Sequence, residues 1–319
     1  MCNIDSASTA LNRGWVYGNY VDSNAAGMTV VDFYTRRYAH SSREVWRERI
    51  DGGLIKLDGR EVRADAIIRA GQHLTYYRPP WREPEVPRDI EILYEDDDLI
   101  AAAKPAGLPV LPGGGYLENT LLHMMRHLYP QKPAPVHRLG RGTSGVVLFG
   151  RSPLGQRQLS ADLRLGRMDK IYRALVAGIS MPEQFVIETP IGRLFYPRLG
   201  YLYAAVPEGK YARSEARVLQ RRFAAGQTLL EVDILTGRPH QIRIHLAAAG
   251  HPLVGDPLYK VGGVPEKVPQ EGRPPLPGDC GYHLHALRVR FAHPRSGEQV
   301  EITSTPPAAL RFSRDLSCD

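Results

Sequence analysis

The stretch PVHRLGRGTSG, residues 135–145, brings glycines and arginines directly against an apolar segment. That segment, Ser144 to Phe149, is short and almost wholly apolar, which is typical of a strand buried on both faces. A loop beside such a strand can present side chains at a sheet edge, where functional sites are often found. Glycines at 140, 142 and 145 permit tight turns or the close approach of a ligand. The stretch therefore predicts a site in a loop.

Arg138 and Arg141 of this loop can bind phosphate through charge-assisted hydrogen bonds. The alternative is a glycine-rich connection whose arginines are merely solvated. The residues alone leave both open.

The composition describes a globular, basic chain. It has 319 residues, 43% of them hydrophobic, which is enough for a buried core and two unequal domains. Lys and Arg number 41 against 34 Asp and Glu, which favours a polyanionic partner such as nucleic acid. No apolar run approaches the ~18 residues of a membrane span, and the first residues lack a signal-peptide pattern. The three scattered cysteines argue against disulfides and zinc ligation. We expect a cytoplasmic protein.

The N-terminal part predicts a small domain. Residues 1–28 show no periodicity, and we interpret them as an irregular leader. Ser41 and Glu44 have the spacing of a capping box, so a helix is expected from Ser41 to about Asp51. The stretch GLIKLDGREV, residues 53–62, predicts a β-hairpin with a primed turn at Asp58-Gly59.

These pieces resemble the S4-type RNA-binding domain in their order, and we assign it residues 29–78. The resemblance implies that phosphates are met by Arg43, Arg47, Arg49 and Lys56. The alternative is a small α+β domain with a solvated basic face. Residues 79–88 hold four prolines and predict a stiff linker, which leaves 89–319 as the second domain.

Several further elements are expected in the second domain. A strand is expected around Asp98 to Ala103. A helix should follow a cap at Asn119, with Met124 and Met125 as core residues rather than ligands. Further along the chain we expect a hairpin, with one strand over residues 215–223 and the other over 228–235. A long surface loop is expected over residues 261–279.

Two more motifs can carry chemistry. The stretch KIYRALVAG, residues 170–178, alternates as a strand does. The stretch LTGRPHQIRIHL, residues 235–246, predicts a helix with Pro239 at its first position and Gly250 at the C′ position just beyond its end. Arg238 and Arg243 would reinforce an anion site at its N-terminus. His240 and His245 are poor metal candidates, because five residues separate them and no carboxylate has the spacing of a zinc motif.

Taken together, these stretches resemble the RluA-type RNA pseudouridine synthases. The first matches the family signature H-R-L-D-x-x-T-S-G at every fixed position except Gly140, where the family has aspartate. The second matches K-x-Y-x-A-L-V-x-G. The third, continued by GHPLVGDPLY at 250–259, matches T-G-R-x-H-Q-I-R-V-H-L and its sequel, and residues 284–294 match a closing L-H-A to F-x-H-P strand. The matches run in order from about residue 89 to 295.

The resemblance implies an α+β fold with a mixed, largely antiparallel sheet, the pseudouridine synthase fold. It implies isomerisation of uridine to pseudouridine in structured RNA, such as rRNA or tRNA, without cofactor or metal. Gly140 takes the position of the catalytic carboxylate, Tyr172 that of the base at uracil C5, and Arg243 that of the arginine that pairs with the carboxylate. RNA is the expected partner of a monomeric protein, with contacts that we assign to Arg138, Arg141, Arg238 and His240.

Glycine has no side chain for nucleophilic catalysis, so two alternatives stay open. One is an RNA-binding pseudoenzyme that kept the fold and lost the nucleophile. The other is an enzyme in which Asp169 or Asp256 replaces the missing carboxylate. The second predicts carboxylate oxygens within hydrogen-bonding distance of Arg243.

Overall fold

The computed structural model describes residues 11–38, 40–197, 199–265 and 273–312. These residues form two compact units. The N-terminal unit contains residues 11–83 and the short segment Tyr196–Gly200. The sheet unit contains the other described residues and all three stretches that resemble synthase motifs.

The N-terminal unit is a four-stranded antiparallel sheet with two helices, and its strand order is β1-β4-β2-β3. Asp58 and Gly59 between β2 and β3 both have positive φ, 50° and 80°, as a primed turn requires. The predicted hairpin is therefore confirmed. The elements are β1 (Trp15–Tyr20), α1 (Val30–Arg37), α2 (Arg43–Asp51), β2 (Ile55–Leu57), β3 (Arg60–Glu61) and β4 (His73–Arg78).

Two expectations for this unit are wrong. Strand β1 lies inside the leader that we expected to be irregular, and it pairs with β4 along its whole length. Its residues are mostly exposed, so the strand has no buried face that could produce an alternating pattern. The cap of α2 is Ser42, whose hydroxyl accepts from the Val45 amide, whereas we expected Ser41. Helix α1, capped by Thr29, was not foreseen.

Aromatic side chains fill the core of the N-terminal unit. Tyr34 and Trp46, one from each helix, pack with ring centroids 4.8 Å apart, and Tyr76 of β4 meets Trp46 edge-on at 5.5 Å. The Arg49 guanidinium lies 4.5 Å from the Trp46 ring centroid, a cation–π contact. Arg49 is thereby engaged within the unit, whereas Arg47 is exposed.

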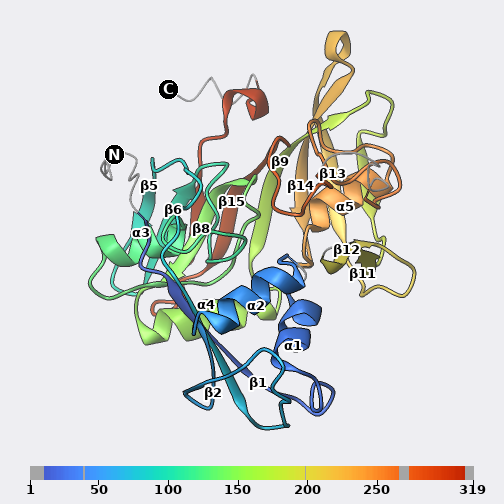
Figure 1. Ribbon diagram of the computed structural model, residues 1–319. Coiled ribbons are helices and arrows are strands. Elements are labelled where there is room, and N and C mark those ends of the chain that lie inside the picture. The colour runs from blue at the N-terminus through green and yellow to red at the C-terminus, as the bar shows by residue number, and fades with distance from the viewer. Residues whose placement is uncertain (1–10, 39, 198, 266–272, 313–319) are drawn as a thin grey trace. The chain divides into compact units, whose positions relative to one another are not determined.

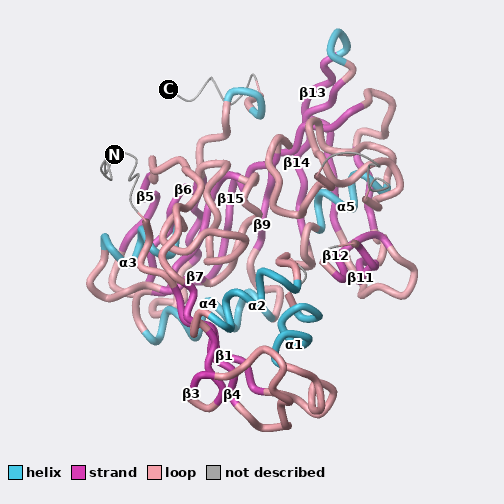
Figure 2. The backbone as a smooth tube through the Cα atoms, in the orientation of Figure 1, coloured by secondary structure: helices cyan, strands magenta, loops and turns pink. Residues whose placement is uncertain are grey.

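The sheet unit is built on a ten-stranded sheet, in which the main order is β10-β13-β14-β9-β15-β8-β6-β5 (Figures 1 and 2). Only the β15–β8 pair is parallel among the described pairs. The predicted mixed, largely antiparallel α+β architecture is thus confirmed. Its main strands are β5 (Glu91–Glu95), β6 (Leu99–Lys104), β8 (Ser144–Gly150), β9 (Asp169–Ala177), β10 (Gln184–Ile187), β13 (Ser214–Arg222), β14 (Gln227–Ile234) and β15 (Leu284–Ala292).

Smaller elements complete this unit. Strands β7 and β16 pair with β8 and β15 at one end of each. A separate two-stranded sheet is formed by β11 and β12. The remaining bounds are β7 (Ala134–Pro135), β11 (Ile191–Tyr196), β12 (Gly200–Ala205), β16 (Gln299–Thr303), α3 (Leu121–Leu128), α4 (Pro153–Arg164), α5 (Gln241–Ala248) and the 3-10 turns η1 (Phe223–Ala225) and η2 (Ala308–Leu310).

Strand β8 confirms the expectation drawn from its apolar sequence, because all of its residues are buried. It lies between β6 and β15, so neither of its edges is free where those strands pair with it. The predicted hairpin is also confirmed as β13 and β14, joined by η1 and by Gly226 at φ 62°. The segment that resembles the second motif forms β9, at the centre of the sheet.

Two helix starts differ from their predicted positions. Helix α3 is capped by Thr120, whose hydroxyl accepts from the His123 amide, while Asn119 donates to the Pro84 carbonyl instead. Met124 and Met125 are buried in the core, as expected. Helix α5 begins two residues after Pro239, because His240 has a left-handed backbone (φ 56°) and acts as its N-cap.

The long loop expected over residues 261–279 is only partly within the described residues, since 266–272 lie outside them. The described remainder contains no helix or strand. Among the described helices, none is long and apolar enough to cross a membrane. Likewise, the described part of the chain holds no group of three or more His, Cys, Asp or Glu side chains that fits a metal ion.

Candidate active site

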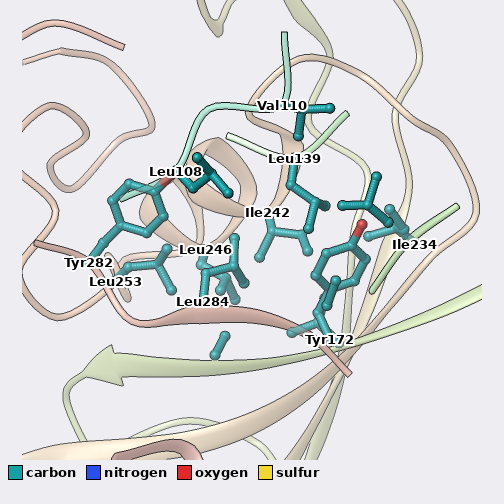
Figure 3. Close-up of a cluster of buried hydrophobic side chains, with 14 of the residues drawn as sticks. Leu108, Val110, Leu139, Tyr172, Ile234, Ile242, Leu246, Leu253, Tyr282 and Leu284 are labelled. Atoms are coloured by element: carbon teal, nitrogen blue, oxygen red, sulfur yellow. The ribbon is translucent and has the colours of Figure 1, made fainter. Parts of the chain in front are cut away.

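The three motif segments meet at one apolar core of the sheet unit. Leu139, Tyr172 and Ile242 come from the 135–145 loop, β9 and α5, and all three belong to the same cluster of buried side chains. Figure 3 shows Tyr172 in this cluster with Leu139, Ile242 and Ile234 around it. Residues more than 100 positions apart in the sequence are thus brought to one place by the central strands.

Tyr172 lies on the central strand of the site and is 9% exposed. Its backbone pairs with Val232 of β14 and Ala286 of β15, so its position is fixed on both sides. Burial raises the pKa of its phenol to about 12. The phenol is therefore protonated at neutral pH. It can take a proton only if its own proton moves at the same time.

Arg243 of α5 is buried, and each of its three guanidinium nitrogens donates a hydrogen bond. Its Nε and Nη2 donate to the two carboxylate oxygens of Asp256 at 2.7 and 2.8 Å, a bidentate ion pair. Its Nη1 donates to the Pro277 carbonyl at 2.9 Å. The rings of Tyr282 and Tyr259 lie 4.2 and 5.0 Å from its guanidinium carbon.

Asp256 satisfies the distance test that we set for a replacement carboxylate, whereas Asp169 does not. Asp169 instead accepts from Arg290 at 2.6 Å in an exposed pair. Asp256 is fully engaged, because its Oδ1 also accepts the amides of Leu258 and Tyr259. Although burial opposes it, hydrogen bonds and the charge of Arg243 lower the pKa of Asp256. This carboxylate is a rigid partner of Arg243 rather than a mobile nucleophile.

Gly140 is exposed, and a buried lysine, Lys104, holds the loop that contains it. Lys104 is 1% exposed, and its ammonium donates to the carbonyls of Pro105, Leu108 and Arg141. Burial lowers the pKa of Lys104 to about 7. The lysine ties the end of β6 to the loop one residue after Gly140, so it fixes the backbone at that position.

The other predicted site residues have different surroundings. Arg138 is exposed. Arg141 donates to the Gly278 carbonyl and the Tyr116 hydroxyl, and Arg238 donates to the Tyr211 carbonyl. His240 lies 2.8 Å from the Tyr259 hydroxyl, which donates to a backbone carbonyl, so Nδ1 of His240 is the donor of that pair. Burial lowers the pKa of His240 to about 3, and its ring is neutral.

Comparison with known proteins gives these segments a common context. Residues 98–248 match the family described as RNA pseudouridylate synthase. An uncharacterized RNA pseudouridine synthase of Synechocystis sp. is 48% identical over 282 residues, which cover 88% of this chain and 95% of that protein. RNA pseudouridine synthase 5 of Arabidopsis thaliana is 41% identical, over 88% of this chain and 89% of that protein.

The chain belongs to the RNA pseudouridine synthase family. Ribosomal large subunit pseudouridine synthase D of Nitrosomonas europaea is 38% identical over 71% of this chain and 66% of that protein, which supports the RluA-type resemblance. Among solved structures, human RNA pseudouridylate synthase domain containing 1 covers 70% of this chain and 86% of its own, with a TM-score of 0.55 and 24% identity. That likeness supports the pseudouridine synthase fold.

As a member of this synthase family, the protein is an isomerase. Three residues around the site were not foreseen from the sequence: Lys104, Tyr259 and Tyr282. Tyr259 ends the 250–259 block and could have been named from it. Tyr282 stands outside the quoted motifs and is one of 16 tyrosines, so the sequence gave no reason to choose it. Lys104 directly follows the strand expected around Asp98 to Ala103, and it lies in none of the quoted motifs.

Proposed function

We propose that this synthase isomerises uridine to pseudouridine in a structured RNA, rRNA or tRNA, with Tyr172 and Arg243 in its reaction site. The observation that carries the proposal is the meeting of Leu139, Tyr172 and Ile242 in one core. Tyr172, beside the 135–145 loop, supplies the phenol, and α5 supplies the arginine. The names of some relatives refer to the ribosomal large subunit, which supports rRNA as one candidate substrate class.

The reaction requires that the N1–C1′ bond of uridine breaks, that the uracil turns, and that C5 bonds to C1′. The proton on C5 then leaves, and N1 ends with a proton. Because these atoms are inaccessible inside a helix, the base must be extruded into the site. We assign proton removal at C5 to Tyr172, whose high pKa requires that its proton and the C5 proton move together.

A specific observation also favours a second function, an RNA-binding pseudoenzyme. Position 140 offers no side chain, and the carboxylate of Asp256 near Arg243 is held by four hydrogen bonds. Neither group can act as a free nucleophile without rearrangement. The two functions share the fold and the RNA partner, and they differ only in turnover.

Release of tritium from [5-³H]uridine-labelled rRNA and tRNA, prepared from cells that lack the gene, separates them. We expect release by the natural protein and a loss of at least about 100-fold in Tyr172→Phe. Filter binding of the same RNA and thermal unfolding of both proteins serve as controls. Tight binding with no release by the natural protein would establish the pseudoenzyme instead.

We further propose that the N-terminal unit is S4-like and that Arg47 and Lys56 contact phosphates of the same RNA. Arg47 is exposed, and the Lys56 ammonium lies 5.4 Å from the Tyr77 ring centroid. Arg43 forms an ion pair with Asp32, so it contributes less free charge. Replacing Arg47 or Lys56 by Gln should weaken RNA binding and reduce the slope of log affinity against log salt by about 1.

Arg63→Gln is the matched control for this surface, since Arg63 already pairs with Asp65 and both are exposed. An unchanged salt slope in the Arg47 and Lys56 variants would remove this contact from the proposal. Cytoplasmic location and a monomeric state stay predictions.

A further inference from the structure

Tyr282 lies against the place where residue 140 would carry a side chain. A Cβ atom on Gly140 would lie 2.9 Å from the Tyr282 hydroxyl oxygen, and its next neighbour would be the Thr143 hydroxyl at 3.5 Å. The first distance is shorter than real Cβ contacts allow, and the second is ordinary contact. The backbone of Gly140 is not left-handed, so it does not itself exclude a side chain. The phenol oxygen is therefore the one close obstacle at this position.

Tyr282 cannot easily move out of the way. It is 5% exposed, and its ring lies 4.2 Å from the guanidinium carbon of Arg243. Its hydroxyl is 3.2 Å from the Thr143 hydroxyl, within hydrogen-bonding distance. A Cβ on Gly142 would lie 2.9 Å from two ring carbons of Tyr282, so that glycine also packs closely on the ring. Contacts on three sides hold the ring between the loop and α5.

We propose that Tyr282 is a positioning residue, which fills the space of the side chain absent at position 140 and holds the loop against Arg243. The proposal rests on the proposed function for its consequence in the reaction. Gly140 and Tyr282 form a complementary pair: the glycine leaves room for the phenol, and the phenol closes that room. Simple restoration of an aspartate at 140 therefore does not restore the family's arrangement.

The electrostatics agree with this assignment. Arg243 already has a carboxylate partner in Asp256, and the Tyr282 ring covers it from a further side. An added carboxylate at 140 would find the Arg243 charge already neutralised by Asp256, and it would lie beside a phenol whose pKa is raised by burial. The site around Gly140 is built for a neutral neighbour.

A double-mutant cycle in thermal unfolding tests the pair directly. Gly140→Asp should lower Tm by about 5 °C in the natural background, because the new atoms overlap the phenol oxygen. In a Tyr282→Phe background Gly140→Asp should lower Tm much less, because the obstructing phenol oxygen is absent while the rest of the ring remains. An equal loss of Tm in both backgrounds would overturn the proposal.

Tyr259→Phe supplies the matched background. Tyr259 also lies over Arg243, at 5.0 Å, but its hydroxyl contacts His240 and the Tyr203 carbonyl rather than the loop. The Tyr259→Phe substitution should therefore leave the loss of Tm caused by Gly140→Asp unchanged. Relief of that cost by Tyr259→Phe as large as the relief by Tyr282→Phe would mean general loosening of the site, and would contradict the specific pair.

Tritium release gives a readout that packing alone would not move. The Gly140→Asp, Tyr282→Phe double variant should release tritium at least about tenfold faster than Gly140→Asp alone. In the Gly140 background, Tyr282→Leu, which removes the ring from Arg243, should lose more kcat than Tyr282→Phe. Equal, measurable rates in either comparison would overturn the role in positioning. Absence of release by every variant would instead contradict the proposed function. The Tm cycle needs no activity, so failure of the proposed function is distinguishable from failure of this pair.

Discussion

The two sides of the candidate site differ in how they handle charge. On the α5 side, Arg243 and Asp256 form a buried bidentate ion pair, with side chains 2% and 1% exposed. On the loop side, Gly140 has no side chain, and a neutral phenol lies beside it. The glycine therefore leaves Arg243 with a paired charge, because Asp256 comes from the same 235–259 block of sequence as the arginine. Loss of the carboxylate at 140 is thus compatible with a stable fold.

The largest effect should come from breaking the ion pair. Asp256→Ala leaves the Arg243 charge buried and unpaired and removes the acceptor of two backbone amides, so it should lower the free energy of unfolding by about 3–5 kcal/mol. Urea titration measures this. Asp169→Ala is the control, since the exposed Asp169–Arg290 pair should contribute at most about 1 kcal/mol. Similar losses in both variants would refute the special status of the buried pair.

The loop side should be broken sterically rather than electrostatically. Gly145 has φ 109°, and an added Cβ would lie 2.1 Å from the Ala286 carbonyl oxygen. Gly145→Ala should therefore cost about 3 kcal/mol or more in unfolding free energy. Gly237→Ala, where a Cβ meets nothing within 4 Å, should stay within about 0.5 kcal/mol. A tolerated Gly145→Ala would show that the loop is not fixed against β15 as described.

Low pH should destabilise both sides of the site, because one histidine on each side is neutral in the folded protein. Burial lowers the pKa of His137, in the loop, to about 4, and that of His240, before α5, to about 3. Between about pH 4 and 6.5 the unfolded chain binds more protons than the folded one, so stability falls as pH falls through this window. Urea titrations at pH 7 and 5 should differ by about 1–3 kcal/mol. In His137→Gln the dependence should be shallower; an unchanged slope would contradict a neutral His137.

The smallest effect should come from replacing Arg138, the exposed arginine of the loop. Arg138 is exposed, so Arg138→Gln should weaken RNA binding about three- to tenfold and reduce the salt slope by about 1, with no change in Tm. Filter binding at several salt concentrations checks this. Arg167→Gln, which removes an arginine that already pairs with Asp162, is the control. Equal weakening by both variants would mean that Arg138 has no particular contact.

Much of the fold could be predicted because local signals agreed with burial. The apolar run of β8 and the turn at Asp58-Gly59 were found as expected. The strand predicted over residues 170–178 was also found as β9, although Tyr172 to Val176 are all buried and do not alternate. The predictions that failed concern elements whose burial leaves no periodic pattern in the sequence. Strand β1 is mostly exposed, and pairing with β4 along its whole length holds it in place. The caps of α2 and α3 fall one residue from their predicted positions, because adjacent polar residues compete for the same role.

The site was predictable in its motif residues but not in their partners. Contact of Arg243 with Asp169 or with Asp256 was an open alternative, and only the structure shows that Asp256 is the partner. Tyr282 comes near Gly140 through the β15 end of the sheet, a long-range contact that leaves no trace in spacing. Packing partners of this kind depend on tertiary structure, which a single sequence does not display.

The central claim is that this chain makes pseudouridine with glycine at position 140 and with Tyr172 as the essential phenol. Chemical mapping of pseudouridine across the rRNA and tRNA of a gene-deletion strain tests it most directly, after complementation with the natural gene or with Tyr172→Phe. We predict at least one site that disappears on deletion, returns with the natural gene and stays absent with Tyr172→Phe. An unchanged map on deletion, or full recovery with Tyr172→Phe, would contradict the account.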